Sequence, residues 1–166
     1  MERVEGQQIT IDGVGEFFLT KGPDSILLWQ TELSQPVVYA EDPVVVNILL
    51  EGNDKLEDVN FPLVQQVVSS LDDFLLKGVS FLREKLQSEP DFFELDETEA
   101  QSFLEEPIET FPLYGPGLTF YTGGNWFIQF AEGDLPICDP YGIIIAFKGE
   151  EPVEVENLAD SDEFED

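Results

Sequence analysis

The sequence contains no histidine and only one cysteine, Cys138, among its 166 residues. Without histidine, catalytic arrangements of the Ser-His-Asp and Cys-His types cannot form, and the commonest protein ligand of transition metals is missing. A lone cysteine cannot form a disulfide within the chain, and free cysteines are usually buried as small apolar side chains. We therefore expect no catalytic residues, no metal site and no cofactor, and we interpret Cys138 as a core residue.

Nucleotide-binding loops and membrane-spanning segments are missing as well. Neither a GxxxxGK[ST] loop nor a GxGxxG motif occurs, and the pair of glycines in residues 12–15 is followed by no predicted helix, so it indicates a turn. No apolar run approaches the roughly 20 residues that cross a bilayer, and residues 1–5 lack the features of a signal peptide. These absences predict a cytoplasmic chain without membrane association.

Basic residues are scarce, since 7 Lys and Arg stand against 36 Asp and Glu, a formal net charge of −29. Nucleic acids and anionic membranes repel such a chain, because they need Lys and Arg to neutralise their own negative charge. A partner attracted by electrostatic forces would be a basic protein. Negative charge also keeps a protein soluble, and solubility without a specific partner is the alternative interpretation.

The acidic residues gather in two stretches that contain no basic residue, 89–109 and 150–166. We expect the part of the first stretch from Glu94 to Glu109 to cover a basic surface of a partner. Aromatic side chains near Gly123-Gly124 are predicted to pack in the core, but any exposed one could anchor a partner, because Trp and Tyr are enriched among binding hot spots. The candidate partner-binding residues are Glu94, Asp96, Glu97, Glu99, Glu105, Glu106, Glu109 and Trp126.

The apolar content is high enough for a folded core despite the charge. Hydrophobic residues make up 42% of the chain and include 14 Phe, whereas disordered chains are poor in both. A length of 166 residues fits one domain. We therefore expect a single α+β domain over residues 1–157, followed by a frayed acidic tail over residues 158–166.

One long helix is predicted over residues 61–87. Its first turn is marked by Asn60 as N-cap and by Pro62. Gly78 weakens it by about 1 kcal/mol relative to Ala and indicates close packing against a sheet. A short helix is predicted over residues 97–104, with Asp96 and other acids at its positive end. The apolar residues at helical spacing in the long helix are Val64, Val67, Val68, Leu71, Phe74, Leu75, Phe81, Leu82 and Leu86.

Strand patterns lie on both sides of the helical region. The segments before it have connections too short for helical crossovers, which indicates an antiparallel meander. Gly123-Gly124 predicts a two-residue hairpin turn. The fold class is therefore α+β, with a mostly antiparallel, strongly twisted sheet packed on one long central helix. The predicted strands are Gln8–Asp12, Glu16–Thr20, Ser25–Leu33, Gln35–Ala40, Pro43–Leu50, Ile108–Tyr114, Leu118–Thr122, Asn125–Ala131, Gly142–Phe147 and Val153–Val155.

Several fragments follow one another in an order that resembles a known group of proteins. They are Ile11-Asp12-Gly13-Val14-Gly15-Glu16-Phe17, Asp96-Glu97-Thr98-Glu99-Ala100, Leu118-Thr119-Phe120, Asn125-Trp126-Phe127 and Asp139-Pro140-Tyr141-Gly142 with the apolar run after it. This pattern resembles the small, acidic, uncharacterised bacterial domains grouped with immunity proteins of toxin systems. Those domains often have His-Gly where this chain has Tyr141-Gly142. The resemblance implies an α+β fold and inhibition of a partner protein by binding.

The first hypothesis for function is therefore a non-catalytic protein-binding domain, in the form of an immunity-type inhibitor of a basic partner. The first alternative is a mimic of nucleic acid that blocks a DNA- or RNA-binding protein. The second is a carboxylate-based Ca²⁺ binder or hydrolase. Residues 51–60 and 160–166 are rich in oxygen ligands, but neither segment fits the D-x-[DN]-x-[DN]-G pattern with its closing Glu.

Overall fold

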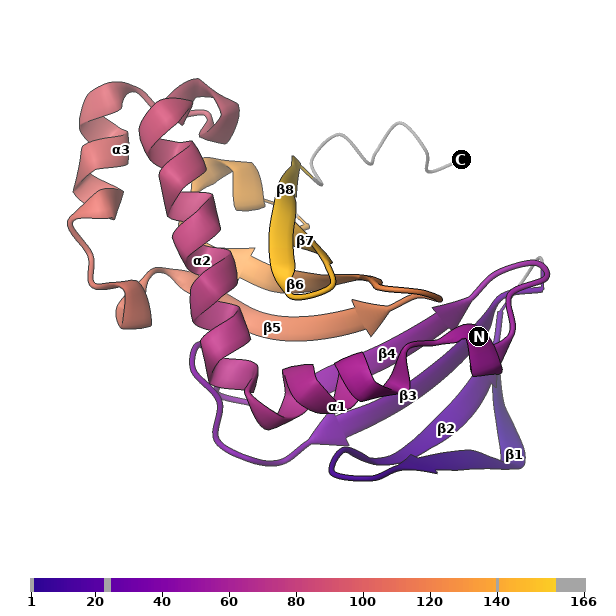
Figure 1. The fold of residues 1–166 in the computed structure, drawn as a ribbon. Coiled ribbons are helices and arrows are strands. Elements are labelled where there is room, and N and C mark those ends of the chain that lie inside the picture. Colours follow the sequence, from indigo (N-terminus) through magenta and orange to yellow (C-terminus); the bar gives the residue numbers. More distant parts are fainter. Residues whose placement is uncertain (1, 23–24, 140, 158–166) are drawn as a thin grey trace.

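The computed structural model describes residues 2–22, 25–139 and 141–157, and within them one eight-stranded sheet keeps its strands in sequence order (Figure 1). Every neighbouring pair is antiparallel except β4 and β5, which are parallel. The predicted α+β class with a mostly antiparallel sheet is confirmed. The strands are β1 (Glu2–Ile11), β2 (Gly15–Lys21), β3 (Leu27–Leu33), β4 (Val44–Leu50), β5 (Leu113–Phe120), β6 (Asn125–Gly133), β7 (Ile143–Lys148) and β8 (Glu151–Asn157).

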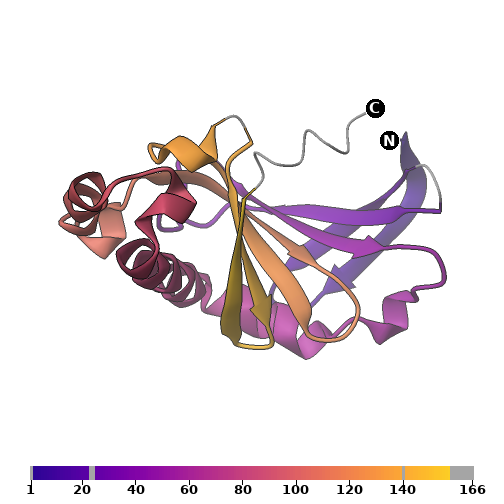
Figure 2. The same ribbon diagram turned by 90° about the horizontal axis from the view of Figure 1, so that it is seen from above.

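The helices lie in the long connection from β4 to β5 and cover one face of the twisted sheet (Figures 1 and 2). They are α1 (Phe61–Ser69), α2 (Leu71–Ser88) and α3 (Glu97–Leu104). α1 and α2 lie against the sheet, while α3 packs on α2 (Figure 2). Short 3-10 turns occupy Leu56–Asp58 (η1), Pro90–Phe93 (η2), Ile108–Thr110 (η3) and Pro136–Cys138 (η4). No helix in the described part of the chain is long and apolar enough to cross a membrane.

The core lies between the helices and the covered face of the sheet. β4 illustrates the division, because Val44, Val46, Ile48 and Leu50 are buried while the residues between them are partly exposed. Successive side chains of a strand point to opposite faces, so these partly exposed residues mark the face without helices. We call this second face, which carries Val45, Asn47 and Leu49, the open face.

The predicted helix over residues 61–87 is wrong in one respect, because it is two helices. Ser70 leaves the helical region with φ −124° and ψ 37°, so α1 ends and α2 begins at this residue. The Ser69 hydroxyl donates a hydrogen bond to the Gln66 carbonyl at 3.0 Å, and such bonds from serine back to the preceding turn compete with helical geometry. The apolar stripe continues in phase through the bend, since Val67, Val68 and Leu71 are all buried, and its periodicity could not reveal the break.

Both predicted helix starts are confirmed. The side chain of Asn60 accepts a hydrogen bond from the Leu63 amide at 3.2 Å at the start of α1. Asp96 and Glu99 form a capping box at the start of α3, in which each side chain binds the other residue's amide. The close packing predicted at Gly78 is also present, because a Cβ at this position would lie only 3.3 Å from Cδ1 of Ile128 on the sheet.

Three local predictions for the strands are wrong. Residues 35–40 form turns and not a strand, since the Ala40 amide binds the Val37 carbonyl at 3.1 Å and the Val38 amide binds the Asp72 carboxylate at 2.8 Å. Residues 108–110 are the 3-10 turn η3, and β5 begins only at Leu113. Residues 121–124 join β5 to β6, so the connection is longer than the predicted two-residue turn. The predicted tail over residues 158–166 lies outside the described residues.

Candidate functional site

The seven carboxylates predicted to bind a partner are all exposed. Glu94, Asp96, Glu97, Glu99 and Glu105 lie between η2 and the C-terminal end of α3, and we call this set the α3 acidic surface. Glu106 and Glu109 lie farther along the chain, toward η3 and the start of β5. A hollow of about 440 Å³ lies along α3 between Glu97 and Glu105, but its lining contains no aromatic side chain.

The prediction that Trp126 contributes to a partner-binding surface is wrong, because its side chain is only 1% exposed. Its ring stacks between Phe120, with 5.2 Å between centroids, and Phe147, with 4.2 Å. Its Nε1 donates a hydrogen bond to the Gly149 carbonyl at 2.7 Å. Trp126 therefore belongs to the core of the covered face, with its one polar atom satisfied.

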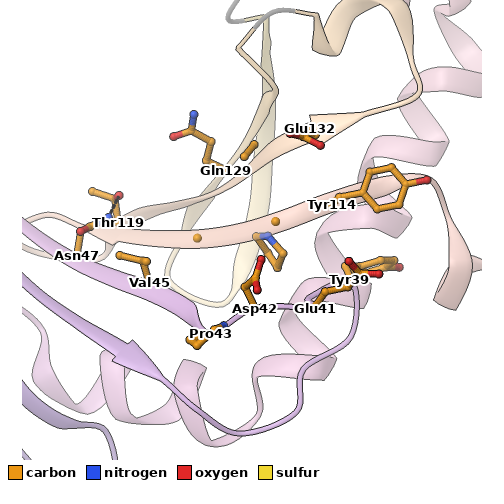
Figure 3. A pocket seen from close by; sticks show the side chains of 14 residues that line it. Tyr39, Glu41, Asp42, Pro43, Val45, Asn47, Tyr114, Thr119, Gln129 and Glu132 are labelled. Atoms are coloured by element: carbon orange, nitrogen blue, oxygen red, sulfur yellow. Dashed lines mark hydrogen bonds between the residues drawn. The ribbon is translucent and has the colours of Figure 1, made fainter.

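A cleft of about 590 Å³ lies on the open face, where β4 and β5 meet (Figure 3). Its residues come from three segments, the turn before β4 with β4 itself, most of β5, and the second half of β6. We call it the open-face cleft. Its lining residues are Tyr39, Glu41, Asp42, Pro43, Val45, Asn47, Tyr114, Gly115, Pro116, Gly117, Thr119, Gln129, Ala131 and Glu132.

The cleft exists because β4 and β5 pair over a short distance only. Their register joins Val46–Ile48 to Leu118–Phe120, and the first half of β5 pairs with β6 alone. Gly115 and Gly117 lie on this half of β5 and carry no side chain, so bare backbone forms the floor of the cleft. A Cβ at Gly117 would have one neighbour within 4 Å, the Val45 carbonyl oxygen at 3.6 Å, which leaves the space above it open.

Tyr39 lies at one end of the cleft in a strained backbone conformation (Figure 3). Its φ of +68° is rare for a bulky residue and costs about 1–3 kcal/mol. The ring packs edge-on against Phe130 with 5.6 Å between centroids, and the hydroxyl donates a hydrogen bond to the Ile108 carbonyl. These contacts hold the ring against the core, at the end of the cleft that Tyr39 helps to line. Burial raises the pKa of Tyr39 to about 12, and the charge of Glu109 adds to the rise.

Tyr114 lies near Tyr39 at the same end and is 44% exposed, which is unusual for a large hydrophobic residue in the described part of this chain. Its hydroxyl donates a hydrogen bond to the Asp134 carboxylate at 3.3 Å. Partial desolvation and the charges of Asp134, Glu106 and Glu41 raise the pKa of Tyr114. The negative charge of Glu106, one of the predicted partner-binding residues, therefore acts on Tyr114 in the cleft. The charge of Glu109 acts on Tyr39 in the same way.

Among the residues that the structure describes, the carboxylates of the cleft have no basic partner. Glu41, Asp42 and Glu132 are exposed, and no lysine or arginine of the described ranges lines the cleft. The two ion pairs within the described residues, Lys77–Glu151 and Lys85–Glu89, do not involve them. Arg83 is near enough to act on Tyr39, but its guanidinium donates to the Leu104 carbonyl at 2.8 Å and lies over the Phe111 ring. The potential in the cleft is therefore negative.

The structure gives Cys138 the buried position that the sequence predicts. Its side chain is 3% exposed, and burial raises the pKa of the thiol to about 12, so the thiolate nucleophile is scarce at neutral pH. Among the described residues, no three or more Asp, Glu, Cys or His side chains come together in a way that could hold a metal ion. The predictions of Ca²⁺ binding, of hydrolysis and of nucleic-acid mimicry stay predictions.

Sequence reasoning placed the candidate site on the stretch from Glu94 to Glu109 and missed the cleft. The cleft combines segments that lie far apart in the chain, and only the parallel pairing of β4 with β5 brings them together. One local pattern could have pointed to it. The alternation of glycine in Tyr114-Gly115-Pro116-Gly117 leaves one face of a strand without side chains, which often marks the close approach of a ligand or another backbone.

Comparisons of the chain with protein-family models, with curated proteins and with solved structures gave no significant match. The resemblance to immunity-type domains therefore stays a prediction.

Proposed function

We propose that this chain is a non-catalytic domain that binds a basic segment of a partner protein at the open-face cleft and along the acidic residues beside it. The single observation that carries the proposal is the cleft itself, a cavity of about 590 Å³ whose described lining has exposed carboxylates and two tyrosines but no basic residue. A basic segment would supply the charge that the cleft lacks. Inhibition of the partner, as the immunity-type resemblance implies, is one result that such binding would have.

The cleft supports this function better than the α3 acidic surface does. Binding hot spots are usually aromatic residues in partly enclosed places, and surrounding charges mainly set the rate and specificity of association. The cleft provides Tyr39 and Tyr114, whereas the hollow along α3 has only polar and acidic residues in its lining. Glu106 and Glu109 extend the negative potential of the cleft toward α3, so the α3 acidic surface would guide the partner without anchoring it.

The test uses a fluorescein-labelled peptide that alternates glycine and lysine, with a glycine–glutamate peptide of equal length as negative control. Fluorescence anisotropy at 50 and 300 mM NaCl gives the affinity. Surface ion pairs contribute about 0.2–1 kcal/mol each and are screened by salt. We therefore expect the lysine peptide to bind at low salt, to weaken at high salt, and to outcompete the glutamate peptide.

Two triple variants locate the binding surface. The cleft variant carries Glu41→Gln, Asp42→Asn and Glu132→Gln, and the matched control carries Glu94→Gln, Glu97→Gln and Glu105→Gln on the α3 acidic surface. Both remove three negative charges, so they have the same net charge. We expect the cleft variant to lose at least about threefold in affinity at low salt and the control to lose less. Equal losses would mean that net charge alone attracts the peptide, and the proposed function would then be rejected.

A further inference from the structure

The open-face cleft has the features of a site for one cationic side chain, in addition to its general negative charge. Its floor is the bare backbone of β5 at Gly115 and Gly117, so a side chain of another protein can lie directly on the strand. The cavity volume of about 590 Å³ is within the roughly 300–1,000 Å³ of small-molecule sites, so it admits a long side chain together with its flanking backbone.

The carboxylates lie on both sides of this floor. Glu41 and Asp42 lie on the β4 side of β5, and Glu132 lies on the β6 side (Figure 3). A group held over the floor would therefore meet negative charge from two directions. A guanidinium group has five N–H donors spread around a plane and can face both sides at once, whereas an ammonium group is a compact and strongly hydrated point charge.

Two tyrosines line the same end of the cleft, Tyr114, which is exposed, and Tyr39, whose ring packs against the core. Tyr39 is fixed by its hydrogen bond to the Ile108 carbonyl and by its contact with Phe130, and Tyr114 is tied to Asp134. Neither ring has to be ordered when a ligand binds, so little conformational entropy is lost there. Arginine stacks on aromatic faces more often than lysine does, and cation–π attraction is strongest where water is partly excluded.

We propose that the open-face cleft is an arginine-binding subsite, in which an arginine side chain of the partner lies over Gly115 and Gly117, beside the tyrosines and between the carboxylates. This inference rests on the proposed function, because it takes the partner to be a basic protein. It adds that recognition depends on the guanidinium group and not on positive charge alone.

The first test compares three peptides of equal length that alternate glycine with arginine, with lysine or with citrulline. Citrulline has nearly the shape of arginine without its charge. Affinities come from anisotropy, and ¹⁵N–¹H NMR spectra locate the contact. We expect the arginine peptide to bind at least about threefold more tightly than the lysine peptide, and the citrulline peptide to bind more weakly than both. The amide signals of Gly115 and Gly117 should shift most with the arginine peptide.

The second test fills the cleft without changing its charge. In Gly117→Val the new side chain projects from the floor into the cavity, and Gly117 has no left-handed backbone angle that would strain valine. Ala146→Val is the matched control, because it adds bulk to the open face on β7, outside the cleft. Valine is favoured in strands, so both variants should unfold at no less urea than the parent protein. We expect Gly117→Val to lose at least about fivefold in affinity for the arginine peptide and Ala146→Val to lose less than twofold.

The outcomes separate this inference from the proposed function. If neither basic peptide binds, both fail. If the lysine and arginine peptides bind equally and Gly117→Val binds as the parent does, the basic-protein function stands and the arginine subsite is rejected. If the arginine peptide is preferred but shifts the amides of α3 and not those of β5, the subsite is likewise rejected.

Discussion

Among the glycines in the described part of the chain, Gly142 leaves the least room for a side chain. It precedes β7 with φ +83°, and its amide donates a hydrogen bond to the Cys138 carbonyl at 2.6 Å. A Cβ added at this position would lie 1.9 Å from the Phe130 carbonyl oxygen and 2.8 Å from that of Ala131. Real Cβ atoms do not approach backbone oxygens so closely, so Gly142→Ala must move β7 away from β6.

Two contributions set the size of the effect. The left-handed conformation costs an alanine about 1–2 kcal/mol relative to glycine. The forced displacement resembles overpacking of a core, which costs about 1–3 kcal/mol. We therefore expect Gly142→Ala to lower the free energy of unfolding by about 2–5 kcal/mol. For a chain of this length, 1 kcal/mol corresponds to about 2–4 °C in Tm, so Tm should fall by about 4–20 °C.

Gly13→Ala is the matched control, because Gly13 has nearly the same φ, +80°, and nothing within 4 Å of the added Cβ. It should show the conformational contribution of about 1–2 kcal/mol alone. Urea unfolding followed by the fluorescence of Trp29 and Trp126, both buried, measures the two variants. If Gly142→Ala is no less stable than Gly13→Ala, the close approach of β6 to Gly142 is refuted.

Three further predictions concern buried or half-buried side chains. Trp126→Ala should lower the free energy of unfolding by about 3–5 kcal/mol and leave peptide binding by the folded protein unchanged; lost binding at full stability would restore its predicted place in a partner surface. Cys138 should react with Ellman's reagent at pH 8 only as fast as the chain opens, and rapid labelling of the native protein would contradict its burial. Because folding raises the pKa of Tyr39 from 10.0 to about 12, the stability it contributes is present below pH 10 and is lost as the pH rises to 12. Urea unfolding at pH 9 and pH 11 should therefore show the advantage of the parent protein over Tyr39→Phe shrinking, and a constant difference would count against the buried hydroxyl.

Patterns of a few neighbouring residues correctly predicted those parts of the fold that neighbouring residues determine. Asn60 carries its capping geometry within four residues, and the structure has this cap where the sequence placed it. The short helix also begins where the acids at residues 96–99 predicted, and the structure adds that Asp96 and Glu99 form a capping box there. Gly78 similarly marked the contact of α2 with the sheet. The break at Ser70 was missed because a stripe of apolar side chains keeps its phase across a bend.

The candidate site was harder to predict, because it depends on pairing between distant segments. Nothing near Val45 or Gly117 indicates that β4 and β5 run parallel, yet this pairing creates the cleft. The burial of Trp126, in contrast, could have been predicted from the residues next to it in the sequence. Trp126, Ile128 and Phe130 alternate along β6, so they share one face of the sheet, and the apolar character of that whole row indicates burial.

The single parallel pairing between β4 and β5 also has a consequence for how the chain folds. Strands β1–β4 and β5–β8 each pair with their immediate neighbours in sequence, and contacts of this kind form quickly. Joining the two four-stranded halves requires residues 51–112 to close on themselves first, which is entropically unfavourable. We expect this junction to form late in refolding. A ligand of the open-face cleft, which spans the junction, would then bind only molecules that have completed that last step.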